Sequence, residues 1–161
     1  MNKLLEWLLN TVSPYKIALQ YSGVPRTIDV DLHNYKQILD LNPDVYMHLW
    51  SDWADDKAPD NAIKTFKPKS HLVEEKNRNQ FTNLINNMRG HNLTIHGSDP
   101  YNAISQFYSR EKCNELRNKS GIQYDVVIIA RTQLSFDRGI TRNELSLAKT
   151  NMLIPDGFDC G

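Results

Sequence analysis

The stretch YDVVIIA, residues 124–130, decides the fold that this sequence predicts. Its apolar run from Val126 to Ala130 is uninterrupted and consists of two valines, two isoleucines and an alanine. β-Branched side chains favour strands, and a continuous apolar run is typical of a strand that is covered on both faces. We therefore predict that this segment is a central strand, buried between two layers of helices.

Three more strands are predicted upstream of this run. They are KIALQYS (16–22), DVYMHLW (44–50) and the shorter HLVEE (71–75). In the second of these, both alternating sets of side chains are large and partly apolar, so both faces of that strand are expected to be covered. Gly23 ends the first strand, and Pro25 prevents its continuation.

Helices are predicted between these strands. Residues 34–41 form a short helix that stops at Asn42-Pro43, because the residue before a proline avoids the helical region. Residues 77–88 form a second helix, with an apolar stripe of Phe81, Leu84, Ile85 and Met88. A third begins at Ser98-Asp99-Pro100, runs to about residue 118, and turns five side chains inward: Ile104, Phe107, Tyr108, Cys113 and Leu116. The polar segment 51–68 is interpreted as a long loop.

This order of elements predicts a three-layer α/β/α domain with a mostly parallel, Rossmann-like sheet. We assign residues 16–161 to that single domain. Residues 1–15 are interpreted as an N-terminal helical appendage, because the leucines between Leu4 and Leu9 suit an amphipathic helix. The alternative for that segment is an anchor in the membrane interface.

Composition excludes several classes of protein. The 161 residues suit one domain, and 19 basic side chains balance 19 acidic ones, so no overall field attracts nucleic acid. No apolar run approaches the roughly 20 residues of a transmembrane helix. Cys113 and Cys160 lack a metal-binding spacing and are interpreted as free thiols in a reducing compartment. We therefore predict a cytoplasmic protein, with a membrane-peripheral one as the alternative.

Candidate site residues follow from the predicted topology, because ligands of parallel α/β sheets bind beyond the carboxyl ends of the strands. These positions hold Ser22, Gly23 and Arg26 after the first strand, Trp50 and Asp52 after the second, and Arg131 and Gln133 after the buried one.

Each of these residues has a functional and a structural interpretation. Gly23 would let a nucleotide approach the backbone and Arg26 would bind its phosphate, or the two form an ordinary turn with a solvated arginine. Trp50 would stack on a base or sugar, or fill the core. Asp52 would help to bind a divalent metal, or belong to a solvated loop. His48 would act as a general base, or it is an interior residue whose hydrogen bonds are made within the protein. The sequence contains no phosphate loop of the G-x-x-x-x-G-K-[ST] type.

Three segments in order resemble a family of glycosyltransferases from bacteria, large viruses and environmental sequences. They are KIALQYSGVPRT (16–27), DVYMHLWSD (44–52) and ISQFYSREKCNELRNKSGIQYDVVIIARTQLSF (104–136). The resemblance covers roughly residues 16 to 137. It implies a GT-A-like fold that binds a nucleotide-sugar donor and transfers the sugar to a glycan or other acceptor. It also implies that Ser22, Gly23 and Arg26 approach the nucleotide and that Arg131 lies near the diphosphate.

The sequence departs from that family at two points. Gln133 stands where the family's metal-binding acid is expected, and an amide brings no charge to Mn²⁺ or Mg²⁺. Metal dependence is therefore open. The sequence also ends at MLIPDGFDCG, where family members continue into acceptor-binding helices, so we expect a C-terminally truncated domain.

Two alternatives remain from the sequence. One is a non-catalytic, degenerate transferase module that binds nucleotide or glycan, which Gln133 and the short C-terminus favour. The other is a different phosphate-handling α/β enzyme, such as a sulfotransferase-like or phosphatase-like domain.

Overall fold

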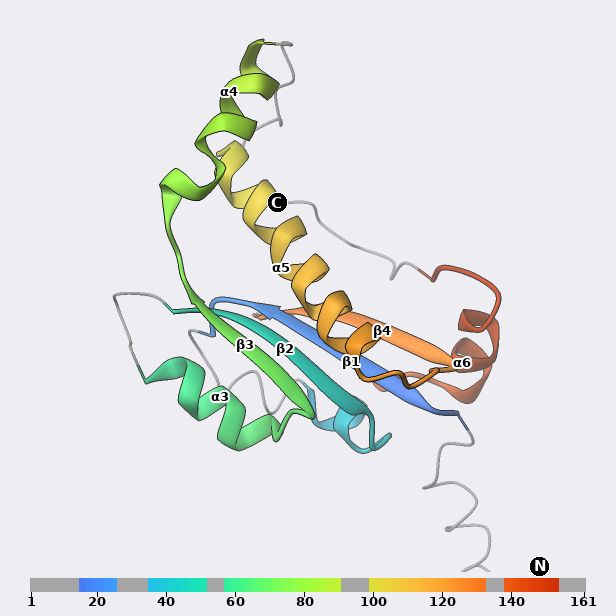
Figure 1. Ribbon diagram of the computed structural model, residues 1–161. Helices are drawn as coiled ribbons and strands as arrows, with labels where there is room; N and C mark the ends of the chain where they lie inside the picture. The colour runs from blue at the N-terminus through green and yellow to red at the C-terminus, as the bar shows by residue number, and fades with distance from the viewer. Residues whose placement is uncertain (1–14, 26–34, 52–56, 91–98, 133–137, 154–161) are drawn as a thin grey trace, which may run out of the picture.

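The computed structural model describes residues 15–25, 35–51, 57–90, 99–132 and 138–153. Within them, four parallel strands form one sheet in the order β3-β2-β1-β4, with helices on both faces (Figure 1). The strands are β1 (Ile17–Gly23), β2 (Asp44–Ser51), β3 (Ser70–Glu75) and β4 (Val126–Arg131). The predicted α/β class with a parallel, Rossmann-like sheet is confirmed.

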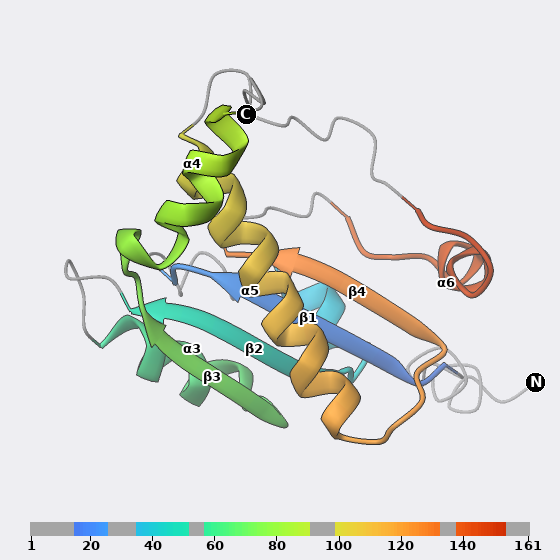
Figure 2. The same ribbon diagram turned by 45° about the horizontal axis from the view of Figure 1, so that its top comes forward.

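Two layers of helices enclose the sheet. Helix α5 (Pro100–Lys119) crosses one face and packs over β1, β2 and β3, as Figure 2 shows. The other face is covered by α3 (Ala58–Phe66) and by a short helix that includes residues 35–39. Between β3 and α5 the chain forms η1 (Arg78–Phe81) and α4 (Thr82–Gly90), and α4 extends away from the sheet. Helix α6 (Arg142–Ala148) packs beside the amino ends of β1 and β4 through Leu145.

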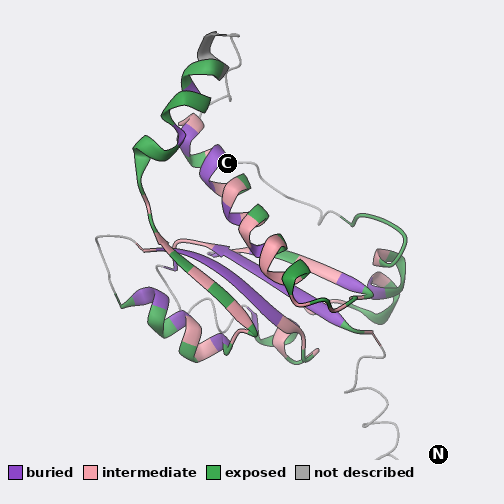
Figure 3. Cartoon of the chain, viewed as in Figure 1, coloured by how far each residue is buried: buried purple, intermediate pink, exposed green. Residues whose placement is uncertain are grey.

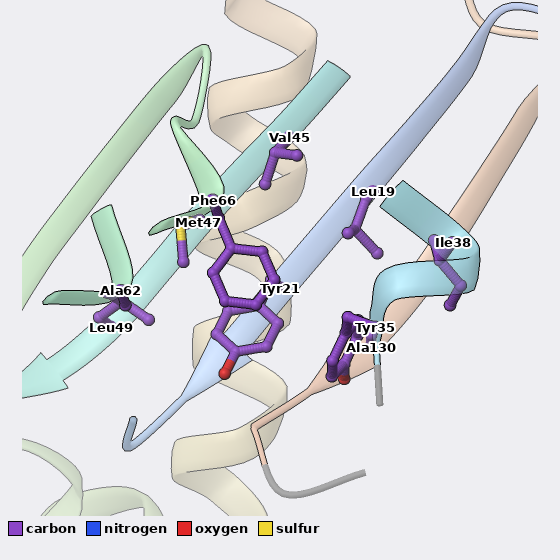
Figure 4. Close-up of a cluster of buried hydrophobic side chains, with 10 residues drawn as sticks. All are labelled: Leu19, Tyr21, Tyr35, Ile38, Val45, Met47, Leu49, Ala62, Phe66 and Ala130. Atoms are coloured by element: carbon purple, nitrogen blue, oxygen red, sulfur yellow. The ribbon is translucent and has the colours of Figure 1, made fainter. Parts of the chain in front are cut away.

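The main core lies between the sheet and α3, and Figure 4 shows its side chains. Three aromatic rings meet at its centre: Tyr21 lies 4.8 Å from Phe66 and 5.3 Å from Tyr35, centroid to centroid. Tilted and edge-to-face arrangements at such distances are favourable beyond the area that they bury. The strands β1 and β2 are almost wholly buried, as the colours of Figure 3 show.

The position of β4 corrects one prediction. Residues 124–130 were expected to be a central strand covered on both faces, but in the described sheet β4 pairs only with β1 and forms an edge. The Ile129 side chain is 57% exposed because α5 lies over the other three strands. An apolar run predicts that a strand is hydrophobic, but it does not predict how many strands lie beside it. That number is set by the topology of the whole sheet.

Helix α3 corrects a second prediction, because it forms inside the segment 51–68 that was interpreted as a loop. Pro59 lies in the first turn, where a missing backbone N–H costs nothing. Ala58, Ala62 and Phe66 are spaced four residues apart and are buried on one face. The prolines and acids were weighed as loop signals, although a helix that begins at a proline carries the same residues.

Two apolar side chains on the helices were wrongly predicted to face the core. Leu84 of α4 is 50% exposed and Phe107 of α5 is 67% exposed, although both were expected to face inward. The predicted N-terminal helical appendage, residues 1–15, lies outside the described residues apart from Tyr15. Among the helices that the structure describes, none combines the length and apolarity needed to cross a membrane.

Candidate functional site

The carboxyl edge of the sheet contains a topological switch point between β1 and β4. The chain passes from β1 to β2 on one side, whereas β4 is added on the other side of β1, after α5 has crossed the sheet. The order β3-β2-β1-β4 corresponds to the first four strands of a Rossmann sheet, and ligands of such sheets bind where the strand order reverses. Gly23 and Arg131 end the two strands at that point.

The ends of β1 and β4 are in direct contact. The Thr132 backbone N–H donates to the Ser22 carbonyl at 2.9 Å. Gly23 has a φ of +129°, and a Cβ placed on it would lie 2.6 Å from Thr132 Oγ1. A residue with a side chain at position 23 would therefore be strained and would displace Thr132. Thr132 was not singled out from the sequence, and its position directly after Arg131 was the only available signal.

Arg131 lies opposite Ser22 in the parallel register, so both side chains are directed to the face that carries α5. Its carbonyl accepts a hydrogen bond from the Tyr35 hydroxyl at 2.6 Å, which ties the end of β4 to the core below. Within the described residues, no acceptor pairs with the Arg131 guanidinium. A partly exposed cation without an internal partner is available to an anionic ligand.

Trp50 fills the core rather than a binding surface. Its side chain is 2% exposed, and it stacks on Tyr108 with the ring centroids 5.6 Å apart and the planes at 24°. The His48 imidazole meets it edge to face at 4.8 Å. The predicted stacking of Trp50 on a base or sugar is not what this arrangement supports, so Trp50 takes no part in the proposal below.

A buried polar chain links three elements through His48. The imidazole Nδ1 lies 2.5 Å from Ser109 Oγ of α5, and Nε2 lies 2.7 Å from Glu74 Oε2 of β3. Burial lowers the pKa of His48, Lys112 lowers it further, and Glu74 offsets part of this change. Neutral His48 donates from Nε2 to the carboxylate and accepts from Ser109 at Nδ1.

This arrangement has the residue types of a hydrolase triad, but Ser109 is 1% exposed and His48 is fully buried, so a substrate has no access to the hydroxyl. It therefore supports the interpretation of His48 as a satisfied interior residue. Ser109 and Glu74 could not be found from the sequence, because they lie 61 and 26 residues from His48.

Cys113 is a buried free thiol, and burial raises its pKa to about 12. It therefore stays protonated at neutral pH, which excludes it as a thiolate nucleophile. The remaining candidates Arg26, Asp52 and Gln133 lie outside the described residues. Across the ranges that the structure describes, no three His, Cys, Asp or Glu side chains gather in a way that could hold a metal ion.

The sheet and its switch point define a mixed α/β protein of the Rossmann-like type. Comparisons with protein-family models, with curated proteins and with solved structures found no match to this chain.

Proposed function

We propose that this chain is the nucleotide-binding part of a glycosyltransferase, with the donor diphosphate bound at the switch point between β1 and β4. The observation that carries the proposal is the convergence of Gly23 and Arg131 at that point. Gly23 ends β1 without a side chain, in contact with Thr132, and Arg131 ends the neighbouring strand with a guanidinium that pairs with no acceptor among the described residues. Close backbone approach and a positive charge are what a diphosphate requires.

The sugar-transfer part of the proposal rests on the three sequence segments that resemble glycosyltransferases. Two of them run through the proposed site, since IALQYSG forms β1 and VVIIAR forms β4. Asp52 and Gln133, the two residues on which the metal prediction depends, lie outside the described residues, so the tests below are run with and without Mn²⁺.

The proposal is tested by calorimetric titration with nucleoside diphosphates and nucleotide sugars, each with and without Mn²⁺. We expect binding that Arg131→Ala weakens by about tenfold or more, because a charge-assisted hydrogen bond contributes about 1.5–3 kcal/mol. Arg142→Ala is the matched control, because Arg142 is exposed at the start of α6, beside the amino ends of the strands. Equal losses of nucleotide affinity in both variants, or no nucleotide binding by the wild type, would refute the proposed site.

Catalysis is tested separately by following release of the nucleoside diphosphate from the sugar donor. Turnover that requires the sugar nucleotide supports a transferase. Binding without turnover supports the non-catalytic alternative. A preference for phosphoadenosine ligands over nucleoside-diphosphate sugars would favour a sulfotransferase-like enzyme instead.

A further inference from the structure

The peptide unit that joins Arg131 to Thr132 is held from both sides at the carboxyl end of β4. Its N–H, which belongs to Thr132, donates to the Ser22 carbonyl of β1 at 2.9 Å. Its carbonyl, which belongs to Arg131, accepts from the Tyr35 hydroxyl at 2.6 Å. In a planar trans peptide the N–H and the C=O point in opposite directions, so these two hydrogen bonds together fix the orientation of the peptide plane.

The Tyr35 hydroxyl binds this carbonyl where a neighbouring strand is missing. In the described sheet β4 pairs only with β1, so no strand lies on its outer side to donate to the Arg131 carbonyl. Arg131 is also the last residue of β4, and the ends of elements open most easily. The hydroxyl therefore replaces a ladder bond at the residue whose guanidinium the proposed site uses.

Tyr35 is itself fixed by the core. Its side chain is fully buried, and its ring meets Tyr21 at 5.3 Å and Phe66 at 5.8 Å, both edge to face (Figure 4). It belongs to the short helix on the α3 side of the sheet, whereas the Arg131 side chain is directed to the face that carries α5. The hydroxyl thus holds the Arg131 backbone from the opposite face and leaves the guanidinium uncovered.

We propose that Tyr35 is a positioning residue of the nucleotide site. Its hydroxyl fixes the peptide unit 131–132 and thereby sets the direction in which the Arg131 side chain leaves the sheet. This inference rests on the proposed function, in which Arg131 binds the donor diphosphate. A binding group that is already in place costs less to order when the ligand arrives, so affinity depends on the residues that hold it.

The test is calorimetric titration of Tyr35→Phe with a nucleoside diphosphate. This variant keeps the buried ring and removes only the hydroxyl. We expect its affinity to fall by about threefold or more, but by no more than that of Arg131→Ala. Tyr124→Phe is the matched control, because it also removes a hydroxyl that donates at 2.6 Å, to Asp44 at the amino end of β2. Its nucleotide affinity should equal that of the wild type.

A double variant separates positioning from a general loss of stability. If Tyr35 acts through Arg131, then Tyr35→Phe should cause no further loss of nucleotide affinity in an Arg131→Ala background. Hydrogen exchange of the Thr132 amide, followed by NMR without ligand, measures the restraint on the peptide itself. Exchange should be faster by about threefold or more in Tyr35→Phe and unchanged in Tyr124→Phe.

The outcomes distinguish this inference from the proposed function. A wild type that binds no nucleotide, or an Arg131→Ala variant that binds as well as the wild type, would refute the donor site and this inference with it. If Arg131→Ala weakens binding but Tyr35→Phe does not, only the role of Tyr35 is overturned. Additive losses in the double variant, or unchanged exchange of the Thr132 amide in Tyr35→Phe, would overturn it equally.

Discussion

The hydroxyl of Ser109 lies 2.5 Å from Nδ1 of His48, and this contact joins α5 to the inner strand β2. Both groups are inaccessible to water, so Nδ1 of His48 depends on the Ser109 hydroxyl for its hydrogen bond. Through Nε2 and Glu74 the same imidazole also reaches the edge strand β3. One side chain therefore fixes the position of a helix and two strands near the proposed binding edge.

Replacing Ser109 by alanine is expected to destabilise the protein by about 1–3 kcal/mol, because Nδ1 of His48 would remain buried without a donor. The control is Ser105→Ala on the same helix. Ser105 is also buried, but its hydroxyl donates only to the Asn102 carbonyl of its own helix at 2.9 Å. We expect that variant to change the free energy of unfolding by less than about 0.5 kcal/mol. Urea denaturation measures both values, and equal losses would contradict the assigned role.

The stability of the protein should fall as pH decreases below about 6.5, the ordinary pKa of histidine. His48 has a lowered pKa in the folded state, so between the two pKa values the unfolded chain binds more protons than the folded one. The contribution of neutral His48 to stability is therefore fully present above its pKa in the unfolded chain. It is lost as pH falls toward the lower pKa that His48 has in the folded protein. Denaturation at a series of pH values measures this slope. The slope should flatten in His48→Gln, and an unchanged slope in that variant would exclude His48 as its source.

Tyr101→Phe is expected to stabilise the protein by about 1 kcal/mol. Tyr101 is 4% exposed, and its hydroxyl finds no hydrogen-bond partner among the described residues. Removing a buried, unsatisfied polar group while keeping the ring recovers its desolvation cost. Tyr124→Phe is the opposite case, because the Tyr124 hydroxyl donates to Asp44 Oδ2 at 2.6 Å. The free energy of unfolding of that variant should fall by about 1–2 kcal/mol, measured by thermal or urea denaturation. If both variants changed the stability in the same direction, this account would be contradicted.

Gly23→Ala is expected to cost about 2 kcal/mol or more, because its positive φ and the close approach of Thr132 both oppose a side chain. Gly121 also has a positive φ of +67°, but a Cβ there meets nothing within 4 Å. Gly121→Ala should therefore cost only the backbone term, about 1 kcal/mol. Repeating Gly23→Ala in a Thr132→Ala background should recover the steric part. A cost that does not depend on residue 132 would show that the contact is unimportant.

Local patterns predicted the strands and the long helix well, but they missed α3. The first two strands begin or end within one residue of the prediction, and the long helix has its proline at the first turn as expected. The polar residues that follow parallel strands also pointed to the edge where Gly23 and Arg131 meet, because parallel strands bring their carboxyl ends together. Whether these residues bind a nucleotide stays a prediction.

What the sequence by itself determined is the class of fold, because hydrophobic period and helix start signals act over a few neighbouring residues. Only the tertiary structure decided that β4 is an edge, that Trp50 is enclosed, and that His48 meets Ser109 and Glu74. Those outcomes depend on which distant segments pack together. A strand at an edge and one at the centre of a sheet can carry the same apolar run.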